Sequence, residues 1–481
     1  MFGSMLNLVN GEFRSAGSGQ VLDVVNPATD EVVGHVPSMD ASDLAAVFDA
    51  AERGAHAWRA AGHIARGQVL HRAAALIRER ADELATVIVA EMGKTRAEAS
   101  GEVGKAAEFF EYYAGLSRLP FGQLLPDARP STVAQVIREP LGVVVLITPW
   151  NDPLLTPARK LAPALMSGNA VVIKPASETP LVMLKLAEIL HEAGLPAGAL
   201  GTVTGRGAKI GDALIQDPQI RAVSFTGSTA VGLKVQRDLA GTGIRVQTEM
   251  GGKNAAVVLD DADLDLAILA IMGGAYGQGG QRCTATSRLI VQRGIASEVK
   301  RRLSEAVGTL RVAAGDADGV DVGPVVSRSA QAEIREHVST ALAEGAEVLA
   351  RASLSAEQER VGAFVEPLLV STTSGSALWK NEVFGPVVGI IEIDTLDEAI
   401  TAVNDSTYGL ACTVFTDGLG AATRFVDEVD TGQVSVNQPT TGWDIHMPFG
   451  GFKESGSAFK EQGLEALQFY TRVKTVAMRT R

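Results

Sequence analysis

Short apolar segments alternate with amphipathic ones over most of this chain of 481 residues. Residues 141–148 and 170–174 are apolar without interruption, which is typical of strands buried on both faces of a parallel sheet. Amphipathic stretches that predict helices lie between these and later strand-like runs. The predicted strands continue at 200–204, 220–225 and 244–248, and the predicted helices lie at 157–167, 179–193, 208–216 and 229–240. This order predicts a doubly wound α/β sheet.

A second alternating block begins at residues 255–259. Helices are expected at 263–276 and 296–310, followed by α/β units at 328–349 and 385–429. The fold class is therefore predicted as α/β with two doubly wound domains. Ahead of both blocks, residues 6–36 read as short strands and turns, and 41–61 and 67–118 read as helices.

One segment interrupts this alternation. Residues 121–130 are rich in turn formers, and 132–138 alternate in the manner of a strand. Such a detour often leaves the domain that contains it, and the tail at 466–476 offers a pairing partner. The sequence therefore predicts a small β element built from two distant parts of the chain.

The bulk properties restrict the function. A net charge of −13 disfavours nucleic acid or an anionic membrane as the main partner, and no apolar run is long enough to span a bilayer. Two cysteines do not make a disulfide framework, and the start of the chain lacks a signal pattern. We expect a cytoplasmic protein with no metal site.

Cys283 is the most informative single residue. It lies on a glycine-rich loop before the strand-like run 288–291, and Glu249 stands 34 residues upstream before Gly251 and Gly252. A thiol can attack a carbonyl carbon to form a thioester, and a carboxylate can activate the water that hydrolyses it. A lone cysteine is more often a small buried apolar residue, so the surrounding motifs must decide between the two interpretations.

Those motifs resemble the signature of the aldehyde dehydrogenase superfamily across nearly the whole chain. They occur in the family's order and comprise Asn26-Pro27-Ala28-Thr29, Thr148-Pro149-Trp150-Asn151, Lys174-Pro175-Ala176-Ser177, Phe225-Thr226-Gly227-Ser228-Thr229, the Glu249 and Cys283 motifs, Asn381-Glu382-Val383-Phe384-Gly385-Pro386 and Pro448-Phe449-Gly450-Gly451-Phe452-Lys453. Residues 281–288, 437–446, 461–463 and 469–471 resemble in particular the α-ketoglutaric semialdehyde dehydrogenases.

The resemblance implies oxidation of an aldehyde with NAD(P). Cys283 would be the nucleophile, and the side-chain amide of Asn151 with the backbone N–H of Cys283 would stabilise the tetrahedral oxyanion. Glu249 would activate the water that releases the acid. Because the acylating branch lacks this base, its presence implies the non-acylating branch. Without the resemblance, Asn151 is more simply a residue that caps a helix or turn before Pro153.

The cofactor would be NAD or NADP. Gly227 and Ser228 follow a strand and begin a helix, where backbone amides can face a pyrophosphate, although Ser228 could also be an ordinary helix N-cap. The resemblance adds four residues: Lys174 for the ribose, Glu382 for the nicotinamide ribose, and Trp150 and Phe384 beside the cofactor. NAD-preferring relatives carry a glutamate where this chain has Ser177, so NADP should be accepted unless the adjacent Glu178 turns inward.

Three residues bear on the substrate. Asp152 replaces a usually aromatic residue, Arg159 is either a surface arginine or a clamp for a carboxylate, and Trp443 should border the substrate mouth. Succinic semialdehyde dehydrogenases carry an arginine at the position of Arg159. The predicted substrate is a small semialdehyde with a terminal carboxylate. An aromatic aldehyde stacked on Trp443, an esterase-type hydrolysis through the same thiol, and a catalytically silent binding or structural relative remain alternatives.

The resemblance also implies a domain division. The dinucleotide-binding domain would comprise residues 1–120 and 140–249, with 441–463 packing back on it, and the catalytic domain would comprise 250–440. Residues 121–139 and 464–481 would form the oligomerisation element of a homodimer or homotetramer.

Overall fold

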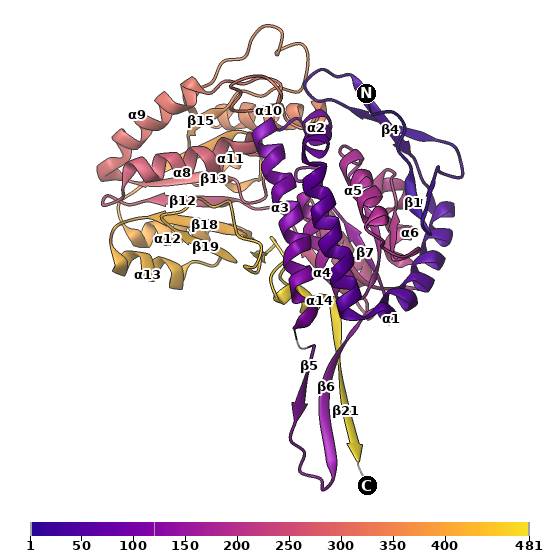
Figure 1. Cartoon of the computed structure of the whole chain (residues 1–481). Helices are drawn as coiled ribbons and strands as arrows, with labels where there is room; N and C mark the ends of the chain where they lie inside the picture. The colour runs from indigo at the N-terminus through magenta and orange to yellow at the C-terminus, as the bar shows by residue number, and fades with distance from the viewer. Residues whose placement is uncertain (1, 120, 480–481) are drawn as a thin grey trace.

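Two sheets lie side by side in the body of the protein, and a third, narrow sheet projects from it (Figure 1). The computed structural model describes residues 2–119 and 121–479. Four residues that fall inside the expected domain ranges, Met1, Pro120, Thr480 and Arg481, lie outside the described residues. The α/β fold predicted from the sequence is confirmed.

The first sheet has five parallel strands in the order β11-β10-β7-β8-β9. The first strand, β7, therefore lies in the middle of the sheet. The chain adds β8 and β9 on one side of it and then returns to add β10 and β11 on the other side. Ligands bind α/β sheets at such a reversal, beyond the carboxyl ends of the strands. The strands are β7 (Val143–Ile147), β8 (Ala170–Lys174), β9 (Leu200–Thr202), β10 (Ile220–Thr226) and β11 (Arg245–Glu249), and the helices are α4 (Leu155–Met166), α5 (Leu181–Glu192), α6 (Gly207–Gln216) and α7 (Thr229–Leu239).

The second sheet has seven strands in the order β14-β15-β16-β13-β12-β18-β19, and β14 runs antiparallel to its neighbour. Its first strand, β12, again lies inside the sheet, between β13 and β18. The strands are β12 (Asn254–Val258), β13 (Thr286–Gln292), β14 (Glu347–Arg351), β15 (Leu368–Ser371), β16 (Val387–Ile393), β18 (Ala411–Phe415) and β19 (Gln433–Val436), and the helices are α8 (Leu264–Tyr276), α9 (Arg293–Thr309), α10 (Arg328–Ala343), α11 (Ala377–Lys380), α12 (Leu396–Asn404) and α13 (Leu419–Glu428).

The amino-terminal helices differ from the prediction of one continuous helix over 67–118. The chain instead forms α1 (Ala41–Glu79), α2 (Ala81–Met92) and α3 (Arg96–Gly115), with a kink in α1 at Gly62. Gly93 ends α2 in the left-handed conformation with φ 90°, which glycine adopts without steric cost. Thr95 then starts α3 with a capping box that includes Glu98. The short strands before α1 are β1 (Asn7–Val9), β2 (Glu12–Arg14), β3 (Val21–Val25) and β4 (Val32–Pro37).

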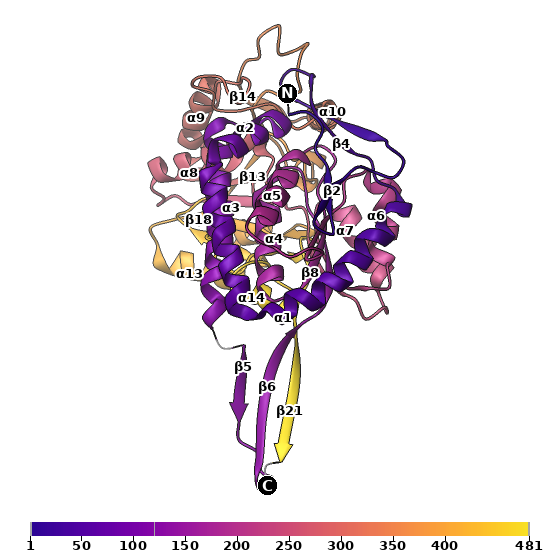
Figure 2. The ribbon, with the colours of Figure 1, turned by 45° about the vertical axis from the view of Figure 1, so that its right-hand side comes forward.

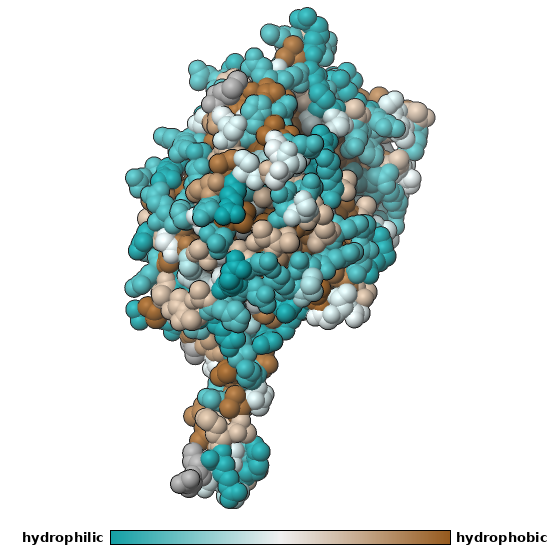
Figure 3. Space-filling model, turned by 90° about the vertical axis from the view of Figure 1, so that its right-hand side faces the viewer, coloured by the Kyte–Doolittle hydropathy of each residue, from teal (hydrophilic) through white to brown (hydrophobic). Residues whose placement is uncertain are grey.

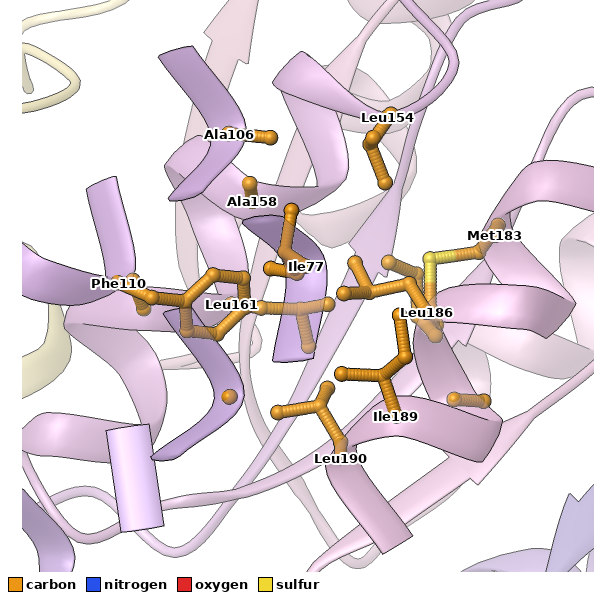
Figure 4. Packing of buried hydrophobic residues seen from close by; sticks show 14 of the residues in the cluster. Ile77, Ala106, Phe110, Leu154, Ala158, Leu161, Met183, Leu186, Ile189 and Leu190 are labelled. Carbon is orange, nitrogen blue, oxygen red and sulfur yellow. The ribbon is translucent and has the colours of Figure 1, made fainter. Parts of the chain in front are cut away.

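The largest core cluster fills the space between these helices and one face of the five-stranded sheet. Figure 4 shows side chains from α1, α3, α4 and α5 in mutual contact, among them Ile77, Phe110, Leu161 and Leu190. Each of these four side chains is fully buried. Burial of a leucine-sized side chain stabilises a fold by roughly 1.5–3 kcal/mol, so this cluster holds α4, and the loop before it, in a fixed position.

The narrow sheet pairs two segments that are far apart in the chain, as predicted. Strand β21 (Thr471–Arg479) runs antiparallel to β6 (Thr132–Pro140), with Thr471 opposite Pro140, and β5 (Gly122–Leu125) covers the other edge of β6. Figures 1 and 2 both show these strands extending away from the body. The short helices η1 (Leu116–Arg118) and α14 (Glu465–Tyr470) lead into it.

The carboxyl-terminal segment before α14 crosses between the two sheets. Its strand β20 (Phe452–Lys453) pairs with β17 (Tyr408–Gly409), which belongs to the second block. Its Ser455 carbonyl also accepts a 2.9 Å hydrogen bond from the backbone N–H of Met250, beyond the end of β11. Among the described residues, no helix has the length and apolar character needed to cross a membrane.

Candidate active site

A cavity of about 680 Å³ lies where residues from the two large sheets meet. Residues 149–159, after β7, and 226–228, after β10, come from the five-stranded sheet. Residues 278–284 and 382–384 come from the block that contains the seven-stranded sheet. The cavity therefore lies beyond the carboxyl ends of β7 and β10, where the strand order reverses. This is the usual place for a ligand site in an α/β sheet.

Cys283 lies on the cavity wall, just after the short helix η2 (Gly277–Gly280). The loop turns sharply because Gln278, Gly279 and Gly280 all have positive φ, and a Cβ on Gly280 would overlap the backbone of Gly385. Burial raises the pKa of the Cys283 thiol to about 12, and the nearby Arg159 guanidinium opposes that rise. A raised pKa favours the protonated form of the thiol in this environment.

Asn151 lies directly beyond β7 and is buried. Its side-chain Nδ2 donates a 2.9 Å hydrogen bond to the carbonyl of Gln281, two residues before Cys283. An amide nitrogen carries two hydrogens, so one remains for a substrate oxygen. The interpretation of Asn151 as a simple turn cap is not favoured, because its side chain connects the β7 loop to the loop that carries the thiol.

Glu249 ends β11 and also lines the cavity. Its side chain is buried, and neither carboxylate oxygen accepts a hydrogen bond from any described residue. Burial raises its pKa well above the ordinary value, and the negative charge of Glu461 raises it further. A Cβ on Gly450 would overlap Oε1 of Glu249, so glycine is required there for the carboxyl group to fit. Glu249 is therefore not a solvated strand-end carboxylate.

A buried ion pair lies behind Glu249. Lys160 and Glu461 form it, and Lys160 also donates a 2.6 Å hydrogen bond to the hydroxyl of Ser224. Arg159 approaches the same carboxylate, with its Nη1 3.6 Å from Oε2 of Glu461. This cluster was not predicted from the sequence, because Glu461 lies 301 positions after Lys160 and only the fold brings them together.

Arg159 faces the cavity and is not the surface arginine of the alternative interpretation. Its side chain is only 14 % exposed, and its guanidinium lies 4.7 Å from the centre of the Phe449 ring and 5.9 Å from that of Phe109. Cation–π contacts of this kind hold a guanidinium in a fixed orientation. Its Nε makes no hydrogen bond within the described part of the chain, so donor capacity remains.

Asp152 lines the cavity beside Arg282, which the sequence analysis did not assign to the site. The Gln278 side chain joins the two: its Nε2 donates to Oδ1 of Asp152 over 3.1 Å, and its Oε1 accepts from Nε of Arg282 over 2.9 Å. The buried amine of Lys94 also donates to Oδ1 of Asp152, over 3.0 Å. Lys94 was missed because its partner Asp152 lies 58 positions away in the chain. Arg282 was not assigned because its place next to Cys283 does not show in which direction its side chain points.

Trp443 lies on the cavity wall in the loop after β19. Its indole Nε1 donates a 3.1 Å hydrogen bond to the carbonyl of Thr440, which fixes the ring to its own loop. Phe109 and Phe449 line the same cavity, so its wall combines aromatic surface with the charged groups described above.

Five of the predicted cofactor residues line the cavity: Trp150, Gly227, Ser228, Glu382 and Phe384. The rings of Trp150 and Phe384 meet edge to face at 5.3 Å. Glu382 accepts a 2.8 Å hydrogen bond from the backbone N–H of Gly252, and burial raises its pKa to about 7. Ser228 is the N-cap residue of α7, yet its side chain makes no capping hydrogen bond, so its hydroxyl is not committed to the helix.

The remaining three predicted cofactor residues lie outside the residues that line the cavity. Lys174 ends β8 and is buried, and its amine donates a 3.1 Å hydrogen bond to the carbonyl of Pro175. The hydroxyl of Ser177 donates over 3.2 Å to the carbonyl of Gly205, whereas Glu178 is exposed. The β8 and β9 loops therefore contact each other at Ser177, beside the exposed Glu178 carboxylate.

The comparisons agree with this geometry. The model of the "Aldehyde dehydrogenase family" matches residues 13–476. The α-ketoglutarate semialdehyde dehydrogenase of Haloferax volcanii is 42 % identical, over 98 % of both chains, and the α-ketoglutaric semialdehyde dehydrogenase of Bacillus subtilis is 38 % identical, over 98 % of this chain and 97 % of that protein. The structure of betaine aldehyde dehydrogenase from Staphylococcus aureus in complex with NAD+ is similar with a TM-score of 0.96 and 31 % identity, covering 99 % of this chain and 94 % of the other.

The chain belongs to the aldehyde dehydrogenase family. It is an oxidoreductase that acts on aldehydes, and the family resemblance predicted from its motifs is confirmed.

Proposed function

We propose that this protein oxidises a semialdehyde with a distal carboxylate to the free dicarboxylic acid, using NAD or NADP. The observation that carries the proposal is the presence of two guanidinium groups, Arg159 and Arg282, on the wall of the cavity that holds the Cys283 thiol. A planar guanidinium matches a carboxylate in a bidentate arrangement. The relatives named as α-ketoglutarate semialdehyde dehydrogenases support the same substrate class.

The two guanidinium groups, and not the cavity wall as a whole, would attract an anionic substrate. The carboxylate that faces Arg159, that of Glu461, is shared with Lys160. Arg282 donates from Nε to the neutral side chain of Gln278. Neither guanidinium therefore has a carboxylate of its own, and a substrate carboxylate would supply the missing negative charge in a site where burial strengthens the attraction.

Catalysis would begin with attack of the Cys283 sulfur on the aldehyde carbon. The thiol proton would pass to solvent water as the carbon–sulfur bond forms and the carbonyl electron pair moves to oxygen. The tetrahedral oxyanion would then accept hydrogen bonds from the Asn151 amide and the Cys283 backbone N–H. A bound nicotinamide dinucleotide would supply the acceptor for the hydride. Water then adds to the thioester on Cys283, a proton passes to Glu249, and the sulfur leaves as the acid forms.

The residues around the cavity fit such a dinucleotide. The hydroxyl of Ser228 is uncommitted at the start of α7, where backbone amides can hold a pyrophosphate. Glu382 is fixed on Gly252 in position to accept from ribose hydroxyls, and a Cβ on Gly251 would overlap its carboxylate. Lys174 and Ser177 lie at the end of β8, where the adenine ribose would bind.

Cofactor choice would depend on Ser177. A serine hydroxyl does not repel the 2′-phosphate of NADP, so we propose that NADP is accepted alongside NAD. Glu178 is exposed, so solvent would screen its charge from that phosphate. Introducing a carboxylate by Ser177→Glu should lower kcat/KM with NADP and leave kcat/KM with NAD nearly unchanged. A parent enzyme that uses NAD alone, and accepts NADP only after Glu178→Ala, would contradict the assignment.

We further propose a functional division of the chain. Residues 1–120 and 140–249 would bind the dinucleotide with 441–463 packed on them, and 250–440 would carry the nucleophile. Residues 121–139 and 464–481 would form the oligomerisation element of a homodimer or homotetramer. A cytoplasmic location would keep the Cys283 thiol reduced, as its chemistry requires.

A panel of aldehydes assayed with NAD and NADP tests the proposed function. It should include an acidic semialdehyde, an uncharged aldehyde of equal length and a benzaldehyde, with Cys283→Ala as the inactive control. We expect the acidic substrate to have the highest kcat/KM. Faster turnover of benzaldehyde would favour the aromatic alternative, since Trp443, Phe109 and Phe449 all line the cavity. If the protein hydrolyses esters but forms no NADH or NADPH with any aldehyde, the proposal is wrong. It is also wrong if no aldehyde is turned over.

A further inference from the structure

Lys94 is a buried charged residue for which the chemistry above has no use. It follows Gly93 in the loop between α2 and α3, and its side chain is only 1 % exposed. Its amine donates to two carboxylates, Glu102 over 2.6 Å and Asp152 over 3.0 Å. Ordering a lysine away from water is costly unless its charge is paired, so these contacts must compensate that cost.

The two carboxylates hold different parts of the site. The second oxygen of Glu102 accepts hydrogen bonds of 2.8 and 2.9 Å from the backbone N–H groups of Leu154 and Leu155. Leu154 is the N-cap residue of α4 and Leu155 is its first residue, and the Leu154 side chain cannot supply a capping hydrogen bond. Glu102 therefore caps α4 from another helix and fixes the loop that contains Asn151 and Asp152.

Asp152 connects Lys94 to the loop that carries the thiol. Its Oδ1 also accepts from Nε2 of Gln278, which donates in addition to the carbonyl of Asn151. The other end of the Gln278 amide accepts from Arg282, the residue before Cys283. A continuous chain of hydrogen bonds thus runs from Lys94 through Asp152 and Gln278 to Arg282.

The charges along this chain explain why Lys94 is needed. Burial disfavours the ionised forms, but the carboxylates of Glu102 and Asp152 outweigh it and raise the pKa of Lys94. For Asp152 the Lys94 and Arg282 charges outweigh the same effect and lower its pKa. Asp152 is therefore a carboxylate on the wall of the cavity, beside the site where an anionic substrate would bind.

We propose that Lys94 is a positioning residue for anionic substrates: it neutralises Asp152 and, through Asp152 and Gln278, holds Arg282 toward the space beside Cys283. Without Lys94, the Asp152 carboxylate would repel an anion near Cys283 and would pull the Arg282 guanidinium toward itself. This inference rests on the proposed function for its substrate, but its electrostatic part concerns any anion that approaches the thiol.

The electrostatic part is tested by alkylating Cys283 with iodoacetate and with iodoacetamide. Both reagents need the thiolate, so the ratio of their rates cancels any change in thiol pKa and reports the potential felt by an anion. The chain has one other cysteine, Cys412, which is fully buried, and mass analysis of the peptides separates the two. Lys94→Gln should lower the iodoacetate-to-iodoacetamide ratio roughly ten-fold, the effect of one uncompensated nearby charge.

Three further variants complete the experiment. Asp152→Asn should raise the ratio, and the double variant Lys94→Gln with Asp152→Asn should return it to the parent value. Lys105→Gln is the matched control, because Lys105 also lines the cavity and the same charge is removed, but its side chain is 48 % exposed and pairs with Glu108. Solvent should screen that change and leave the ratio almost unaltered.

The outcomes separate positioning from a merely structural role. If Lys94→Gln slows both reagents equally, or if Asp152→Asn fails to restore the ratio, the proposal is overturned. If Lys94→Gln does not fold, Asp152→Asn alone must still raise the ratio. In turnover, Lys94→Gln should raise KM for the acidic aldehyde far more than for the uncharged one. If the parent does not prefer acidic aldehydes, the proposed function fails, and the alkylation ratios still decide the role of Lys94.

Discussion

At the scale of single residues, Glu249 combines burial with a lack of hydrogen-bond partners among the described residues. Because burial and Glu461 raise its pKa, its basic form becomes populated only as the pH rises. Glu249→Gln should therefore leave the first burst of reduced cofactor intact and slow the steady state by about 10²–10⁴-fold. Rapid mixing at several pH values measures both phases. The parent's steady state should increase from neutral to alkaline pH, and equal loss of burst and steady state in the variant would contradict the assignment.

Arg159 gives the second prediction at this scale. Hydrogen bonds to charged groups contribute about 1.5–3 kcal/mol, so Arg159→Ala should raise KM for an acidic aldehyde at least roughly ten-fold. The KM for an uncharged aldehyde of equal length should change little. Arg159→Lys keeps the positive charge but loses the planar guanidinium that binds a carboxylate through two hydrogen bonds. Its KM for the acidic aldehyde should therefore lie between that of the parent and that of Arg159→Ala. Similar changes for both substrates would show that Arg159 supports the packing around Phe449 and does not bind the substrate.

The residues that the sequence predicted and those that it missed differ in a physical respect. Cys283 and Glu249 stand in local motifs whose glycines are needed where backbone passes close to other groups, so adjacent residues reveal them. Lys94 and Glu461 acquire their environments from segments distant in the chain: Asp152 is 58 positions from Lys94, and Lys160 is 301 from Glu461. No local pattern records such contacts, and a lone lysine or glutamate in a sequence resembles any solvated residue.

At the scale of elements, Glu91 on α2 supports the start of α5. It is fully buried, and its two oxygens accept hydrogen bonds of 2.7 and 3.0 Å from the backbone N–H groups of Leu181 and Val182. Burial nevertheless raises its pKa to about 8. The folded state therefore holds the proton more tightly than the unfolded chain, and the stability contributed by this group decreases as the pH rises from about 4.5 to about 8.

Glu91→Gln tests this pH dependence. The variant loses one of the two acceptors, which should cost about 1 kcal/mol at low pH, but it cannot ionise. Its free energy of unfolding should therefore approach that of the parent as the pH increases from 5 to 8. Urea unfolding at several pH values measures the difference, with the exposed Glu31→Gln as the control. A difference that stays constant or widens with pH would show that Glu91 is ionised in the folded protein.

The ends of strands and helices could be predicted where the pattern of apolar residues changes abruptly. They could not be predicted where the same apolar spacing continues from one helix into the next. The strands of the five-stranded sheet were predicted within about two residues, because an apolar run ends where the strand leaves the core. The later strands of the second sheet were predicted only as parts of α/β units. The helix expected over 67–118 is divided instead at Arg80 and Gly93. Its apolar spacing continues through Ala81 and Leu84 across the first break, so the periodicity does not reveal where the axis changes direction.

At the scale of the whole molecule, the narrow sheet is too small to have a core of its own. Its strands β5 and β21 form the two edges, and each carries an exposed apolar side chain, with Leu124 75 % and Val473 56 % exposed. Figure 3 shows apolar residues on the surface of this projecting part. Exposed strand edges with apolar side chains are an aggregation hazard unless another chain covers them. This arrangement supports the proposal, which the family resemblance suggested, that the element joins copies of the chain.

Charging this sheet should therefore dissociate the oligomer. In Leu124→Lys combined with Val473→Lys, each lysine replaces an apolar side chain that a partner would bury, and burying an unpaired charge is strongly unfavourable. Sedimentation velocity should show a homodimer or homotetramer for the parent and a smaller species for the variant. Leu419→Lys is the control, because Leu419 is 80 % exposed on α13 in the body of the protein. A monomeric parent, or a double variant of unchanged mass with an intact fold, would show that the sheet does not hold the copies together.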